Sequence, residues 1–473
     1  MELRLVAKNV AALGIASVLS KAITAVVGIL VTRYLGPGPF GDYSAAYAFA
    51  GTFVLFTDFG ISQLMVQEGS RDESGLPVFL GNVLVFKVIT SSIVYVLMLI
   101  LMHPAGYNIT IQRMVEVLGI STGLNALAGS VYNYYQTKQQ MYLAAGYQFL
   151  TTLLIGVLTV VIIAWHGDVV QITYSHLAVA VVIGIMLYIA ISRRMSLRVD
   201  LKALPQMLVR ALPFGAAYIF YNIYFSIDSF MLSIMRTPTE LGIYSAAYRL
   251  IAVLLFIPGI LTSVIYPVLF QLGVTDKAQH QKTIEKIVKV LGAVGIPGSV
   301  LLFVLAKPLI GWLYANRFPA SAPIMMILTW FFALECLGFA IGDVLTTTNR
   351  QFLRTVIQGV AAIGNILLNL VLIPRMGIYG AAIATLITEV YIFAAYYFVV
   401  RKLVYKLHIW RQFLVVVGAV VVMAGVAYEL RGLNPVVSSF LAGVVYLAIV
   451  IAFDSDFRQI GRYAWRQVLR LKA

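Results

Sequence analysis

The chain has 473 residues, of which 61% are hydrophobic and only 11% are charged, and its mean hydropathy is +0.92. Soluble domains carry about a quarter charged residues, so this composition excludes a soluble protein and indicates an integral membrane protein. The net charge of +15 does not indicate a nucleic-acid partner, because the basic residues are spread over many short connections. The single cysteine, Cys336, excludes an internal disulfide and thiolate metal sites.

Apolar segments long enough to cross a bilayer recur along the whole chain. The first is too long for the apolar region of a signal peptide and lacks a cleavage site, so we expect it to be a retained span. We predict an all-α protein with fourteen transmembrane helices, at 10–32, 41–66, 78–102, 114–135, 142–165, 169–192, 208–235, 241–270, 287–313, 322–347, 351–373, 378–400, 411–430 and 435–453.

The basic residues predict the orientation of these spans. Most Lys and Arg residues fall in connections on the side of both termini, so the positive-inside rule predicts that both termini are cytoplasmic. Three inner stretches are strongly basic: 193–210, 277–289 and a C-terminal ridge of Arg458, Arg462, Arg466 and Arg470. We expect all three to face anionic lipid headgroups, with Trp465 and Leu469 of the ridge turned toward lipid.

A repeated phrase indicates an internal duplication. Gly41-Asp42-Tyr43-Ser44-Ala45-Ala46-Tyr47 recurs as Gly242-Ile243-Tyr244-Ser245-Ala246-Ala247-Tyr248, each at the start of a long apolar segment. Because each half holds six spans, we expect two lobes with the same orientation, related by a pseudo-two-fold axis along the membrane normal. The predicted domains are a first lobe at 1–195, a second lobe at 196–403, and an appended helix pair with a basic amphipathic tail at 404–473.

The predicted outer connections are short. A membrane transferase or polymerase acting at the outer face needs catalytic groups on a sizeable loop, and the longest outer connection, 103–113, is too short for that. We therefore expect a transporter and no enzymatic activity.

The basic residues Lys21, Lys87 and Arg249 lie inside predicted spans, where a charge costs about 2.5–3.5 kcal/mol. Lys21 lies about 20 Å from the inner end of the first span, on a face with Gly14, Ser17, Thr24 and Gly28. This face suits a water-filled cavity, and the alternative is a pair between Lys21 and an acid such as Asp58. Lys87, in the third span, is expected to extend to the inner surface.

Arg249 is the third of these residues and directly follows the second copy of the repeated phrase. Its guanidinium offers a planar fork that suits phosphate oxygens. With Lys21 and Arg249 in separate lobes, we expect a cavity that attracts a large anion, and a pyrophosphate group fits that description.

Several motifs resemble one transporter family. They are the phrase Tyr34-Leu35-Gly36-Pro37-Gly38-Pro39-Phe40-Gly41, then Asp58-Phe59-Gly60, and Asp228 followed by Ser229-Phe230-Met231-Leu232. Together with the fourteen predicted spans, they resemble the polysaccharide-transporter (Wzx-like) flippases of the multidrug/oligosaccharidyl-lipid/polysaccharide exporter superfamily. This resemblance implies alternating-access transfer of polyprenyl-(pyro)phosphate-linked oligosaccharide from the inner to the outer leaflet of the cell membrane.

The resemblance also implies site residues and partners. Lys21 and Arg249 match cationic cavity residues of the related lipid II flippases, and Asp58, Tyr221 and Tyr224 are further candidate substrate contacts. Most tyrosines in such a chain belong to interfacial belts and the core, which is the alternative for these two. Polysaccharide assembly proteins are the expected protein partners.

A candidate sodium site follows from the same resemblance, with no other cofactor expected. Its members are Asp228, Asn365, Asn369, Ala381 and Thr385. Asn369 stands where the related site has a second carboxylate, which weakens the field on a cation. Hydrogen bonding between helices is the alternative role for the Asn and Thr residues.

Glu335, Asp343 and Glu389 are further acids that we expect to be buried within predicted spans. They form either a proton relay or a balance for the cations of the cavity, so the coupling ion is Na⁺ or H⁺. The rival function is export of small cationic compounds by a MATE-like antiporter. Two deep basic residues disfavour that rival, while the buried acids favour it.

Overall fold

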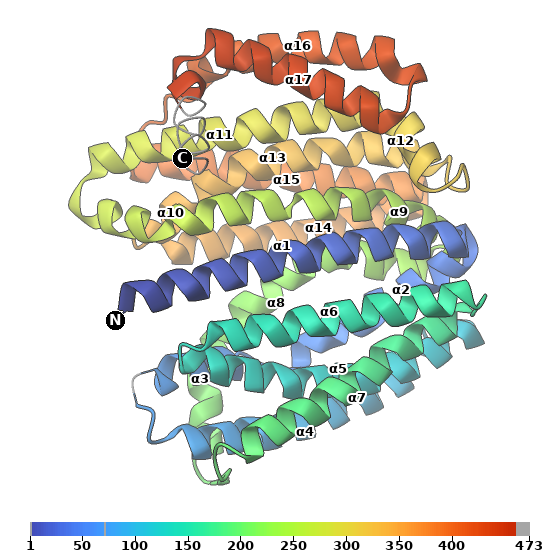
Figure 1. Ribbon diagram of the computed structural model, residues 1–473, viewed down its shortest axis with the longest axis vertical. Coiled ribbons are helices and arrows are strands. Elements are labelled where there is room, and N and C mark those ends of the chain that lie inside the picture. Colours follow the sequence, from blue (N-terminus) through green and yellow to red (C-terminus); the bar gives the residue numbers. More distant parts are fainter. Residues whose placement is uncertain (1, 71, 460–473) are drawn as a thin grey trace, which may run out of the picture. The chain divides into compact units, whose positions relative to one another are not determined.

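The computed structural model describes residues 2–70 and 72–459, without the side chains at 2–13, 213–214, 216–224, 260, 263–264 and 410–411. This part of the chain contains helices and no strand (Figure 1). Twelve of its helices have the length and composition to cross a membrane, and one bent pair adds a thirteenth. The predicted all-α membrane architecture is therefore confirmed. Residues 462–470 of the C-terminal ridge lie outside the described residues.

The chain divides into two compact units, Met1–Ser245 and Ala246–Ala473. The first contains, in order, α1 (Glu2–Leu35), α2 (Pro37–Val54), η1 (Leu55–Thr57), α3 (Ile61–Gly69), α4 (Leu76–Leu101), α5 (Ile109–Thr137), α6 (Met141–Ala164), α7 (Val169–Ser192), α8 (Leu204–Met235) and the start of α9 (Pro238–Leu254). In this unit α4 packs on α5, α5 on α7, α7 on α6 and α6 on α1 (Figure 1).

The second unit repeats much of this packing order. It contains the rest of α9 and then α10 (Phe256–Thr275), α11 (Lys277–Val304), α12 (Ala306–Leu313), α13 (Ser321–Thr347), α14 (Gln351–Met376), α15 (Ile378–Leu403), η2 (Trp410–Phe413), α16 (Leu414–Glu429), η3 (Leu430–Gly432) and α17 (Pro435–Phe453). Here α11 packs on α13, α13 on α15 and α15 on α14, as α4, α5, α7 and α6 do in the first unit. The helix pair α16–α17 adds to this core through α11 and α12.

The structure corrects the predicted role of one basic residue. Lys289 was expected to face lipid headgroups from the start of the ninth span. The helix α11 instead begins earlier, at Lys277, and places Lys289 in the interior. Its Nζ lies 2.7 Å from Asp454 Oδ2 and 2.6 Å from Asp456 Oδ2, just after α17. Within the second unit, Lys289 therefore links α11 to the segment that follows α17.

The junction between α1 and α2 consists of a single residue, Gly36. Its φ of 75° lies in the left-handed region, which glycine adopts without strain, and Pro37 then occupies the first turn of α2. The phrase that joins the first two spans is thus a tight turn.

The two glycines that begin the repeated phrase meet inside the first unit. A Cβ on Gly41 would lie 1.6 Å from the backbone oxygen of Pro238, at the start of α9. A Cβ on Gly242 would lie 2.1 Å from the oxygen of Pro37 and 3.0 Å from the nitrogen of Gly41. Backbones therefore touch at this crossing, and only glycine leaves room for the contact.

We predict that Gly41→Ala destabilises the protein, because its methyl group has no space at the crossing. Overpacking of this kind costs about 1–3 kcal/mol, which lowers the melting temperature by several degrees. The matched control is Gly51→Ala in the same helix, where an added Cβ has no neighbour within 4 Å. Thermal melting of the purified protein, followed by intrinsic fluorescence, compares the two, and equal melting temperatures would contradict the crossing.

Candidate functional site

Lys21 is exposed on α1 and points away from the body of the first unit. On the other side of α1, Ile23 and Val27 approach Gly156 of α6 closely enough that a Cβ there would lie 3.1–3.2 Å from them. At about 100° per residue, Lys21 lies on roughly the opposite face of the helix. It is 14 residues, or about 21 Å, from the end of α1 at Leu35. The lysine therefore stands deep within the span and outside the packed core.

The second span is broken at Asp58-Phe59-Gly60, where α2 with η1 meets α3 at a bend of 44°. Phe59 and Gly60 both have positive φ, at 47° and 82°. A phenylalanine in this region is uncommon and needs support from its surroundings. Gly215 of α8 provides the space, since a Cβ there would lie 2.5 Å from the oxygen of Phe59.

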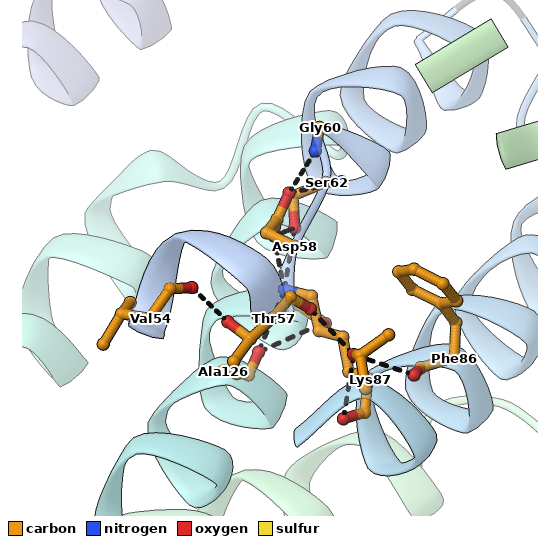
Figure 2. Close-up of polar contacts among 10 residues, drawn as sticks. Val54, Thr57, Asp58, Gly60, Ser62, Phe86, Lys87 and Ala126 are labelled. Atoms are coloured by element: carbon orange, nitrogen blue, oxygen red, sulfur yellow. Dashed lines mark hydrogen bonds and ion pairs between the residues drawn. The ribbon is translucent and has the colours of Figure 1, made fainter. Parts of the chain in front are cut away.

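Asp58 satisfies the amides that the break exposes, as Figure 2 shows. Its Oδ1 accepts from the backbone nitrogens of Gly60 at 3.1 Å and Ser62 at 3.3 Å, at the start of α3. Its Oδ2 accepts from Ser62 Oγ at 2.5 Å. A helix start favours a carboxylate because its first N–H groups lack partners within the helix. The acid therefore shapes the bend.

Lys87 of α4 binds the same carboxylate (Figure 2). Its Nζ lies 2.8 Å from Asp58 Oδ2 and donates to Ser62 Oγ at 2.8 Å and to the carbonyl oxygen of Ala126 at 3.0 Å. Only 2% of Lys87 is exposed. The expectation that Lys87 extends to the inner surface is wrong, because all three of its donors find acceptors inside the unit. Lys87 is also the ion-pair partner of Asp58, in place of Lys21.

Asp228 is buried in α8, and Tyr244 Oη donates to its Oδ2 at 3.3 Å. Both residues belong to the first unit. Tyr244 comes from the second copy of the repeated phrase, so that phrase also helps to hold the acid. The side chains of Tyr221 and Tyr224 lie outside the described residues.

The other four members of the candidate sodium site lie in the second unit, on α14 and α15. Asn369 Nδ2 donates to Asn365 Oδ1 at 2.9 Å, and Thr385 Oγ1 donates to the carbonyl oxygen of Ala381 at 3.0 Å. Asn365 also donates to Thr388 Oγ1 at 3.3 Å, which joins the two helices. These buried amide, hydroxyl and carbonyl oxygens suit a hard cation and also suit helix packing.

The three remaining acids separate into two groups in the second unit. Asp343 pairs with Arg354 of α14, with 2.8 Å between Oδ1 and Nη1, and Arg354 also donates to Thr346 Oγ1 at 2.9 Å. The charge of Asp343 is therefore balanced by Arg354 within the second unit. Glu389 of α15 is buried against α13, where a Cβ on Gly338, one turn from Glu335, would lie 3.7 Å from Glu389 Oε1.

Arg249 is half-buried in α9 and belongs to the second unit. Tyr314 of the same unit is buried, and its hydroxyl donates to the carbonyl oxygen of Ala246 at 3.0 Å. The Tyr314 hydroxyl thus contacts the second copy of the repeated phrase, three residues before Arg249.

We predict that Asp58→Asn and Lys87→Met each destabilise the protein, because each leaves a buried charge without its partner. Breaking a buried pair costs up to about 3–5 kcal/mol, whereas the double variant removes both charges and should recover most of the loss. Thermal melting of the four proteins gives the coupling energy. Additive effects of the two substitutions on the melting temperature would show that the ion pair contributes nothing to the stability of the protein.

The chain is similar in sequence to archaeal membrane proteins. It is 22% identical over 253 residues to the probable low-salt glycan biosynthesis flippase Agl15 of Haloferax volcanii. The aligned region covers 52% of each of the two chains. It is 28% identical over 167 residues to the probable flippase AglR of the same organism, over 34% of this chain and 35% of that one. The chain thus matches about half of the first relative's length and about a third of the second's.

Solved structures share the fold over most of the chain. A lipid II flippase, MurJ, in an inward closed conformation superposes with a TM-score of 0.81 at 16% identity, covering 94% of this chain and 99% of that one. An inward-facing MATE multidrug resistance transporter of the MOP superfamily has a TM-score of 0.64 at 15% identity and covers 80% of this chain and 93% of its own. The chain therefore shares its fold with these two transporters.

A family model agrees with the resemblance that the sequence motifs carry. The model described as polysaccharide biosynthesis protein matches residues 6–273, which is more than half of the chain and includes Asp58, Lys87, Asp228 and both copies of the repeated phrase. With its helical membrane fold, the chain belongs to the polysaccharide biosynthesis protein family.

Proposed function

We propose that this protein is a flippase that moves polyprenyl-(pyro)phosphate-linked oligosaccharide from the cytoplasmic to the outer leaflet of the cell membrane, for the assembly of cell-surface polysaccharide. Three findings support the proposal: the family match, the two relatives named as probable flippases, and the fold shared with a lipid II flippase. The proposed orientation places both termini in the cytoplasm, in accord with the basic inner stretches.

The observation that carries the proposal is the exposure of a lysine deep in the first span. Lys21 is exposed at a depth where lipid contact with a charge is unfavourable. A cation in that position is best accommodated facing water, and it then offers a binding site for a phosphate group that enters from the cytoplasmic side.

We propose the following division of roles among the residues. Lys21 supplies a point charge, and Arg249 supplies a planar donor pair that suits two phosphate oxygens. The glycan lies in the water-filled cavity, and the polyprenyl chain stays in lipid while the headgroup is transferred. Asp58 has its charge committed to Lys87 and to the amides of α3, so its proposed contribution to substrate binding is the shape of the bent second span.

The coupling ion is proposed to be a cation. Na⁺ is the candidate for the site built on Asp228, Asn365, Asn369, Ala381 and Thr385. A proton is the candidate for Glu335 and Glu389, two acids on the packed helices α13 and α15. Asp343 is excluded as the proton carrier because Arg354 balances it.

Export of small cationic compounds is the second candidate function, and the MATE fold match favours it. A binding site for organic cations is expected to be acidic and aromatic. The exposed Lys21 therefore opposes this function. Resistance of whole cells to cationic dyes separates the two, because only the MATE-like function predicts it.

We predict that Lys21→Ala and Arg249→Ala each abolish complementation of a strain that lacks its own lipid-linked-oligosaccharide flippase, at unchanged protein level. Each variant removes a phosphate contact while leaving the buried core unchanged. The matched control is Lys138→Ala, which removes a half-buried lysine paired with the exposed Glu73 and should complement fully. Full complementation by both cavity variants would overturn the proposed phosphate site.

We predict that one of two acids carries the coupling. If Na⁺ drives transport, Asp228→Asn abolishes the stimulation of transport by a sodium gradient in proteoliposomes, and Glu389→Gln does not. If a proton drives it, Glu389→Gln abolishes the response to a pH gradient, and transport ignores sodium. Transport that is indifferent to both gradients and to both substitutions would overturn cation coupling altogether.

A further inference from the structure

An apolar groove lies on the first unit, away from the residues discussed so far. Its volume is about 390 Å³, and it is lined by α4, α5, α7 and the segment after α7. Among its lining residues are Val88, Leu124 and Val181, which lie far from the helix ends, and Ile191 and Leu197, which lie at and beyond the end of α7. The groove therefore runs from the membrane surface into the hydrocarbon.

The depth of the groove corresponds to one leaflet. Val181 lies 11 residues from the end of α7 at Ser192, which is about 16 Å, and Val88 lies 12 residues from the start of α4 at Leu76, which is about 18 Å. Half of a hydrocarbon core of about 30 Å is about 15 Å. One lipid chain of a single leaflet thus has the length to fill the groove.

Positive charge gathers where the groove reaches the surface. Arg193, Arg194 and Arg198 are exposed and lie next to the lining residues Ile191 and Leu197, and residues 191–199 contain no acid. Arg194 is held in place by Gln140, to whose Oε1 it donates at 3.0 Å, and by the ring of Tyr135. Within the described part of the chain, no salt bridge involves these three arginines.

We propose that this groove binds one hydrocarbon chain of an anionic membrane phospholipid, whose phosphate contacts the arginines at 193–198. The apolar lining recognises the chain, and the basic rim selects an anionic headgroup over a zwitterionic one. By the positive-inside rule the bound lipid belongs to the cytoplasmic leaflet. The site is separate from Lys21 and does not depend on the transport activity.

Gly184 provides a direct test, because it lines the middle of the groove and an added Cβ there has no neighbour within 4 Å. Gly184→Phe therefore starts a large side chain in open space and directs it at the groove. Gly425→Phe on α16 is the matched control, since that glycine is also in a helix and also has no neighbour within 4 Å.

The experiment places the full chain in nanodiscs with equal amounts of phosphatidylglycerol and phosphatidylcholine, and counts retained lipids by native mass spectrometry. The wild type and Gly425→Phe should retain phosphatidylglycerol, and Gly184→Phe should retain roughly tenfold less, because several methylene groups lose their contacts. Arg193→Gln with Arg198→Gln should remove the preference for phosphatidylglycerol over phosphatidylcholine.

Equal retention of phosphatidylglycerol by the wild type and Gly184→Phe would overturn the proposal. A wild type that retains both lipids equally would overturn the role of the arginines. Displacement of phosphatidylglycerol by added polyprenyl phosphate, blocked in Gly184→Phe, would show that the groove holds the tail of a transported substrate instead. Because lipid retention needs no transport, failure of the flippase assays leaves this result interpretable by itself.

Discussion

The cost of placing a charge in hydrocarbon governs the internal arrangement of both units. Among the described residues, three cations of the interior each lie against a carboxylate from another segment of the chain: Lys87 against Asp58, Lys289 against Asp454 and Arg354 against Asp343. A buried charge without such a partner is strongly unfavourable, so each pair fixes the register between two elements. Lys21 differs from these three in its exposure, since its side chain is exposed deep within the first span. That exposure is the reason to place function there.

The same constraint explains how the second span tolerates a break. A bend inside a membrane exposes amides and carbonyls that lipid cannot satisfy. Asp58 accepts from two of the amides, and Thr90 Oγ1 donates to the carbonyl oxygen of Thr57 at 3.1 Å. Lys87 then neutralises the carboxylate that makes this possible. The ion pair and the bend therefore stabilise each other, and the motif Asp58-Phe59-Gly60 is primarily a structural device.

Glycines also contribute to the packing of the helices. They do so because they lack a side chain, and their backbone flexibility matters less. Gly41 and Gly242 let two backbones touch at the start of α2 and α9, and Gly215 accommodates the backbone of Phe59. Gly184 differs, because nothing in the protein occupies the space that its side chain would take. An open position of this kind on a membrane helix is filled by lipid, and the arginines nearby indicate which lipid.

The sequence by itself determined the membrane class, the all-helical architecture and the family, because apolar length and local motifs are properties of contiguous residues. It did not show that the predicted spans 41–66, 241–270 and 287–313 are each divided into separate helices. It also showed the repeated phrase, although not that its two glycines would meet. It placed Lys87 and Lys289 wrongly, since the partner of each lies far away in the chain and only packing brings the two charges together. The link of Arg354 to Asp343 likewise had no signal in residue spacing. Tertiary structure decided these pairs because helix faces meet at a register that the periodicity of one helix does not encode.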